Sequence, residues 1–101
     1  MRLSKIIKKC KTFVKIKNFY DFEVNGISDN SKRIKENFIF AAIKGEKQNG
    51  EFYISSLSKI KKVAIIVSEN YQIKSKNSNC VFIKCKSVRQ VLSEVSSIIF
   101  T

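Results

Sequence analysis

The sequence contains no histidine, no proline and no tryptophan, and only three glycines and three cysteines among its 101 residues. Without histidine, the chain cannot form a Ser–His or Cys–His nucleophilic pair, or a zinc site that depends on imidazole ligands. Three glycines are too few for a glycine-rich phosphate cradle, and neither G-x-x-x-x-G-K-[ST] nor G-x-G-x-x-G occurs. The eight acidic residues are scattered, without a pairing typical of acid–base catalysis. The sequence therefore favours a binding module over an enzyme, with no catalytic residue and no metal site.

The three cysteines, Cys10, Cys80 and Cys85, form no C-x-x-C pair. If residues 80–85 form a strand, the odd offset places Cys80 and Cys85 on opposite faces, so they cannot hold one metal ion together. An odd cysteine count, with no apolar stretch of a signal peptide near the basic amino terminus, is typical of a reducing compartment. We therefore expect a cytoplasmic protein whose thiols serve as small apolar fillers.

Long apolar runs are also missing. The longest covers residues 38–43, which is too short to cross a bilayer, so we expect no membrane span. A length of 101 residues suits a single domain with a modest core, and we expect a monomer.

Positive charge is what the sequence has in excess, with 20 lysines and arginines against eight acids and a formal net charge of +12. Such an excess is typical of proteins that bind nucleic acid or anionic membranes. All but three of these cations are lysines, whereas arginine is the usual residue for bidentate phosphate contacts. Lys, Ile and Asn are all specified by AT-rich codons, so we attribute much of the charge to genome bias. A solvated basic face is favoured over nucleic-acid binding.

Apolar patterning predicts several strands. Residues 38–43 and 63–67 are continuous apolar runs, which are typical of fully buried strands. A third short strand is predicted at residues 80–84, and one or two strands at residues 13–27, where Asn25-Gly26 signals a turn.

Helical spacing separates these strands. Residues 3–10 carry apolar side chains at i, i+3, i+4 and i+7, and residues 53–60 give a second helical face. The last helix carries an apolar stripe over residues 88–99 and begins at Ser87, which forms a capping box with Gln90. Strands alternating with helices predict an α/β domain in which helices flank a mixed, partly parallel sheet.

One stretch, residues 27–54, carries a spaced motif: ISDNSKRIKENFIFAAIKGEKQNGEFYI. Its pieces are Asn30-Ser31-Lys32, the strand from Asn37 to Ala42, and Gly45 followed by Asn49-Gly50. In this order and spacing they resemble the amino-terminal domain of the Mur ligases, bacterial ATP-dependent enzymes that extend the peptide of peptidoglycan precursors. The family pattern is Asp-Ser-Arg, then Gly-x-Leu-Phe-x-Ala, then a glycine followed shortly by Asp-Gly. Asn30 and Lys32 thus depart from the family's Asp and Arg.

The opening residues 3–7 and Arg89 look most like the MurE type, which adds diaminopimelate or lysine. The resemblance implies that the chain, residues 1–101, is one domain of a longer ligase of cell wall biogenesis. It further implies that the domain binds the UDP end of UDP-N-acetylmuramoyl-dipeptide. Ser31 offers its hydroxyl to the pyrophosphate between Asn30 and Lys32, and three loop residues lie against the uridine: Glu46, Lys47 and Gln48.

The resemblance also implies that ATP and Mg²⁺ bind on later domains, so this chain holds no cofactor and is inactive alone. Two alternatives remain open: the ligase that adds D-alanyl-D-alanine, and a stand-alone basic module for RNA or anionic surfaces. Local sequence permits plainer interpretations as well. Asn30-Ser31 suits a simple turn, residues 46–48 suit a solvated loop, and Phe38 and Phe40 suit the core.

Overall fold

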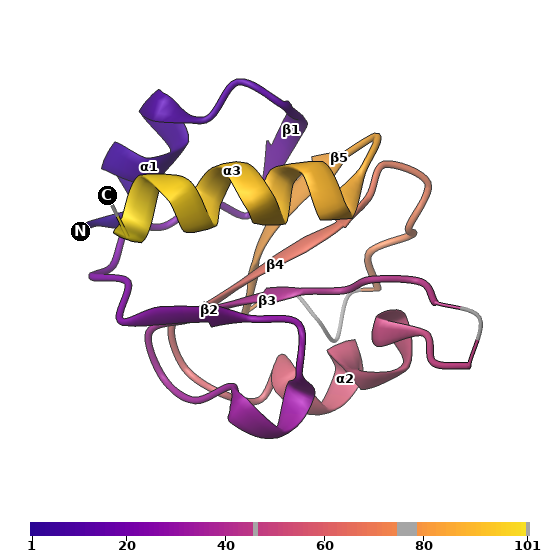
Figure 1. Ribbon diagram of the computed structural model, residues 1–101. Coiled ribbons are helices and arrows are strands. Elements are labelled where there is room, and N and C mark those ends of the chain that lie inside the picture. Colours follow the sequence, from indigo (N-terminus) through magenta and orange to yellow (C-terminus); the bar gives the residue numbers. More distant parts are fainter. Residues whose placement is uncertain (46, 75–78, 101) are drawn as a thin grey trace.

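The computed structural model describes residues 1–45, 47–74 and 79–100. Within these residues the chain forms three α-helices, five strands and two 3-10 turns, arranged around one sheet (Figure 1). In chain order they are α1 (Leu3–Lys9), β1 (Phe13–Lys17), β2 (Gly26–Ser28), the 3-10 turn η1 (Ser31–Arg33), β3 (Phe38–Ala41), the 3-10 turn η2 (Gly50–Tyr53), α2 (Ile54–Leu57), β4 (Val63–Ser68), β5 (Val81–Cys85) and α3 (Val88–Phe100).

The strands form one mixed sheet in the order β1-β5-β4-β3-β2. Strands β2, β3, β4 and β5 are parallel to one another, and β1 pairs antiparallel with β5. The central strand β4 is buried at every position from Val63 to Val67, because both of its faces are covered. The predicted α/β fold with a mixed, partly parallel sheet is confirmed.

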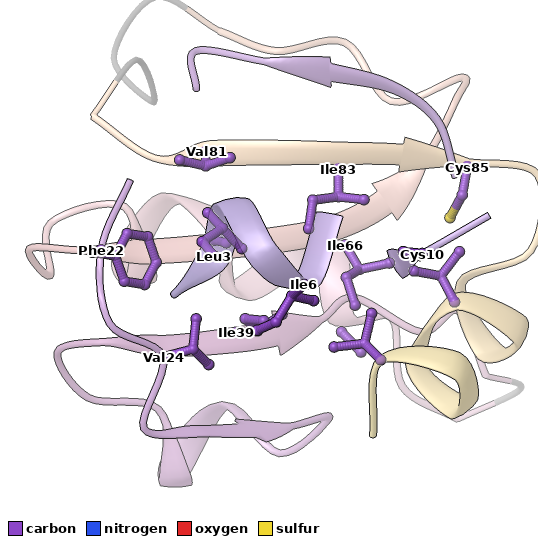
Figure 2. Close-up of a cluster of buried hydrophobic side chains, with 14 residues drawn as sticks. Leu3, Ile6, Cys10, Phe22, Val24, Ile39, Ile66, Val81, Ile83 and Cys85 are labelled. Carbon is purple, nitrogen blue, oxygen red and sulfur yellow. The ribbon is translucent and has the colours of Figure 1, made fainter. Parts of the chain in front are cut away.

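Two apolar layers sandwich the sheet. On one face, α1 and α3 lie over a core built around Leu3, Ile6 and Ile39 (Figures 1 and 2). On the other face, α2 covers a second core that includes Phe40 and Ile54. Strand residues alternate between the two cores, as the pleat of a β-strand requires.

Cys80 and Cys85 follow that alternation. Cys80 packs in the core under α2, whereas Cys85 packs in the core under α1 and α3. The prediction that these thiols lie on opposite faces is therefore confirmed. All three cysteines are free and buried, and burial raises the pKa of Cys80 and of Cys85 to about 11. At neutral pH they are protonated fillers rather than nucleophiles.

The predicted helix signals at the two ends of the chain are confirmed. Ser87 Oγ accepts a hydrogen bond from the backbone N–H of Gln90 at 3.2 Å, which satisfies one free amide at the start of α3. Val91 and Val95 in α3 are buried, as are Leu3 and Ile6 in α1.

The turn predicted at Asn25-Gly26 is wrong. Gly26 begins β2 and takes no positive φ, and an added Cβ there would lie 2.7 Å from the ring of Phe38. Glycine here accommodates the close approach of the Phe38 ring and does not form a turn. Asn18, the first residue after β1, adopts the left-handed conformation with φ of 56°.

The helical face predicted over residues 53–60 is only partly correct. Ile54 and Leu57 are buried in the short helix α2, but Tyr53 is 40% exposed. A helix of one turn has room for few core positions, so the neighbouring aromatic side chain stays at the surface.

Candidate functional site

A tight polar turn follows β2. Ser28 Oγ accepts a hydrogen bond from the N–H of Asn30 at 3.0 Å, and Asn30 Oδ1 accepts one from the N–H of Lys32 at 3.0 Å. These bonds satisfy the first free amides of η1, as short polar side chains do at helix starts. The turn interpretation of Asn30-Ser31 is confirmed, and it presents Ser31 and Lys32 beyond the end of the strand.

A second loop follows β3 and is closed on itself. The N–H of Gly45 donates to the carbonyl oxygen of Gln48 at 2.7 Å, and the N–H of Gly50 donates to that of Ile43 at 2.8 Å. Asn49 Oδ1 accepts from the N–H of Glu51 at 2.9 Å and so begins η2. These bonds hold Lys47 and Gln48 at the tip of a short hairpin-like loop.

Gly50 lets this loop approach the sheet. A Cβ at this position would lie 2.8 Å from Ala42 Cα and 2.9 Å from the backbone N of Ile43. Backbone atoms cannot rotate away as a flexible side chain can, so residue 50 has no room for a larger side chain. The close packing fixes where the loop leaves β3.

The two loops meet at one hollow of about 560 Å³. Asn30, Ser31 and Lys32 of the first loop line it, together with Lys47 and Gln48 of the second loop. Five of the six predicted site residues are thus brought together, and the sixth, Glu46, lies outside the described residues. The hollow lies beyond the carboxyl ends of the parallel strands β2 and β3, the usual place for ligands in open α/β sheets.

The hollow offers donors suited to a phosphate group and an amide suited to the edge of a nucleobase. Ser31 supplies a half-buried hydroxyl, and the exposed lysines Lys32 and Lys47 supply two cations. Hydroxyl and ammonium donors close together stabilise phosphate oxygens through charge-assisted hydrogen bonds. Gln48 adds an amide, which can both donate to and accept from a nucleobase edge.

Three lining residues were not among the predicted site or motif glycines: Asp29, Ile43 and Tyr53. Asp29 is adjacent to the predicted triplet and follows β2 directly, so its position in the motif was the available signal. Tyr53 was assigned to an apolar helical face, although it stands only three residues after the glycine that closes the loop. The predicted core role of Phe40 is confirmed by its full burial, and Phe38 packs partly buried against the same core.

Within residues 1–45, 47–74 and 79–100, no group of three or more acidic or cysteine side chains is arranged to hold a metal ion. In the same part of the chain, no helix has the length and apolar character needed to cross a bilayer.

Comparison with known proteins places the chain beside one group of enzymes, although no protein-family profile matches it. It is 32% identical over 73 residues to UDP-N-acetylmuramoyl-L-alanyl-D-glutamate–2,6-diaminopimelate ligase 2 of Clostridium acetobutylicum, covering 72% of the chain and 15% of the relative. The corresponding ligase of Fusobacterium nucleatum is 35% identical over 77 residues, covering 76% of the chain and 15% of the relative. The corresponding ligase of Clostridioides difficile is 28% identical over 96 residues, covering 95% of the chain and 19% of the relative.

These similarities confirm the predicted resemblance to the Mur ligases and, within them, to the MurE type. The fold is consistent with a Mur ligase amino-terminal domain. The matched part amounts to 15% of the length of the first two relatives.

Proposed function

We propose that this chain binds the UDP moiety of UDP-N-acetylmuramoyl-dipeptide as the amino-terminal domain of a MurE-type ligase. The observation that carries the proposal is the meeting of Asn30-Ser31-Lys32 with Lys47 and Gln48 at one hollow. The diaminopimelate ligases that the chain resembles bear the corresponding substrate in their names, which supports the same assignment.

Different residues contact different parts of the ligand. Ser31 Oγ and the Lys32 ammonium donate hydrogen bonds to the pyrophosphate. Lys32 offers a single point charge where an arginine would make a bidentate contact. Asn30 keeps the turn in place, because its Oδ1 already accepts from the N–H of Lys32. On the opposite side Lys47 and Gln48 lie against the uridine, where the Tyr53 ring offers an aromatic surface.

In this proposal, other parts of the parent ligase form the amide bond. The sequence has no phosphate loop, so ATP and Mg²⁺ bind on other parts of the parent ligase, which works in the cytoplasm. The chain, a monomer, contributes substrate binding and orientation. Incubation of the chain with ATP, diaminopimelate and the UDP-linked dipeptide therefore releases no ADP, and release above background would contradict this division of roles.

The direct test is calorimetric titration with UDP-N-acetylmuramoyl-dipeptide, with UDP and with ADP. Binding of the first two, with ADP at least about tenfold weaker, is expected because the loop contacts are to uridine. Lys32→Gln lowers the affinity about tenfold through loss of a charge-assisted contact. Lys59→Gln removes the same charge from an exposed position outside the hollow and leaves the affinity unchanged.

The same titration decides between the alternatives. Equal affinity for UDP and ADP, or equal effects of the two lysine variants, would overturn the UDP site. Binding of short RNA with a steep loss of affinity on adding salt would instead support a basic polyanion module. Preference of the parent ligase for D-alanyl-D-alanine over diaminopimelate would favour the second ligase type.

A further inference from the structure

Three lysines from two neighbouring strands share one face of the sheet. Lys15 and Lys17 stand two residues apart on β1 and therefore point to the same side. Lys84 of β5 is the partner of Lys15 in the antiparallel register. Phe82, the partner of Lys17, packs in the core under α2, which identifies the face that these side chains share.

These lysines repel one another. The pKa of Lys17 is lowered from its usual value of 10.5, first by the side chain and charge of Lys15, then by desolvation and by the charge of Lys84. Like charges directly opposite one another destabilise a β-sheet. The ion pairs found among the described residues involve other cations, Met1, Arg2 and Lys44, so this cluster is not neutralised by a carboxylate there.

A hollow of about 520 Å³ adjoins the cluster. Lys17 and Lys84, but not Lys15, line it together with Asn18, Asn70 and Gln72, whose side-chain amides can donate hydrogen bonds. Glu69 is the acidic residue in the lining. The hollow shares no lining residue with the one between the loops after β2 and β3.

We propose that Lys15, Lys17 and Lys84, with the adjoining amides, form a second anion site that takes a compact phosphate-type anion. Separate ammonium groups suit such an anion, because each lysine contributes a compact charge with three donors to a different oxygen. The bound anion also removes the like-charge repulsion between the strands. The site is independent of the proposed UDP site and does not depend on it.

The test uses inorganic pyrophosphate as the probe, in the Lys32→Gln background so that the first hollow is weakened. The lysine side-chain signals of labelled protein are followed by NMR, with sodium chloride at equal ionic strength as the control. We expect saturable shifts at Lys15, Lys17 and Lys84, and a rise in the pKa of Lys17 that chloride does not reproduce.

Matched variants locate the effect. Lys84→Gln lowers the pyrophosphate affinity about tenfold, whereas Lys59→Gln leaves it unchanged. Shifts that match those in chloride, or equal losses in both variants, would show general screening and overturn the site. Titration of the wild-type protein with UDP separates the two sites. If UDP does not bind but pyrophosphate does, the UDP proposal is wrong and the present proposal stands. Saturation by short RNA without saturation by pyrophosphate would also overturn it, in favour of a surface for longer polyanions.

Discussion

The thiol of Cys10 donates a hydrogen bond of 2.9 Å to the carboxylate of Glu94, 84 residues further along the chain. The same carboxylate accepts hydrogen bonds from the backbone N–H groups of Lys11 and Thr12, each at 3.1 Å, and from the Thr12 hydroxyl. One side chain of α3 therefore holds the link between α1 and β1. No local rule of sequence relates residues so far apart.

Glu94→Gln tests this contact. The amide keeps the shape but loses the negative charge, and its NH₂ cannot accept from the donors around it. We expect the free energy of unfolding to fall by about 1 kcal/mol, since these are charge-assisted bonds at a half-buried position. Urea unfolding followed by circular dichroism measures the change. Glu36→Gln, at an exposed position, is the matched control and should leave the midpoint unchanged.

Acid should destabilise the fold in a defined pH range. The hydrogen bonds from Cys10 and Thr12 lower the pKa of Glu94 from 4.5 to about 2, and Arg2, then Ser4, lowers that of Asp21 from 3.8 to about 2. Because the unfolded chain takes up these protons at higher pH than the folded one, stability is lost as the pH falls from about 5 to about 2.

Melting temperatures between pH 7 and pH 2 measure that loss, and Glu94→Gln should show a shallower decline than wild type. Parallel declines in the two proteins would show that Glu94 does not carry its share of the pH dependence.

Gly50→Ala should displace the loop after β3. The added methyl meets the backbone of Ala42 and Ile43, which can yield only by moving the strand end or the loop. We expect a loss of about 1–3 kcal/mol in the free energy of unfolding, together with weaker UDP binding. Ser93→Ala, at an exposed position of α3, serves as the control. Unchanged stability in Gly50→Ala would mean that the close approach is not required.

Tyr53 and Phe52 form a matched pair for the role of the aromatic ring. Tyr53 lines the hollow, whereas Phe52 is 80% exposed and is not among the lining residues. Stacking on a base contributes about 1–3 kcal/mol, so Tyr53→Ala should lower the affinity for UDP about tenfold. Phe52→Ala should not change it. Equal losses by calorimetry would rule out stacking on Tyr53.

Local sequence was sufficient for many elements. The apolar runs at residues 38–43 and 63–67 predicted β3 and β4, and the spacing in residues 3–10 and 88–99 predicted α1 and α3. The motif also named five described residues that the structure then brings to one hollow. The local turn prediction at Asn25-Gly26 was wrong. The dipeptide is typical of turns, whereas here the glycine accommodates the ring of Phe38.

The sequence by itself determined which segments are buried on both faces, where the last helix begins, and that Cys80 and Cys85 lie on opposite sides of the sheet. These properties depend on side-chain periodicity along one segment. Only the tertiary structure decided that the Lys32 and Lys47 loops line one hollow, that Tyr53 lies beside it, and that Lys84 stands opposite Lys15. Strand order and register set those relationships, through pairings between residues far apart in the chain.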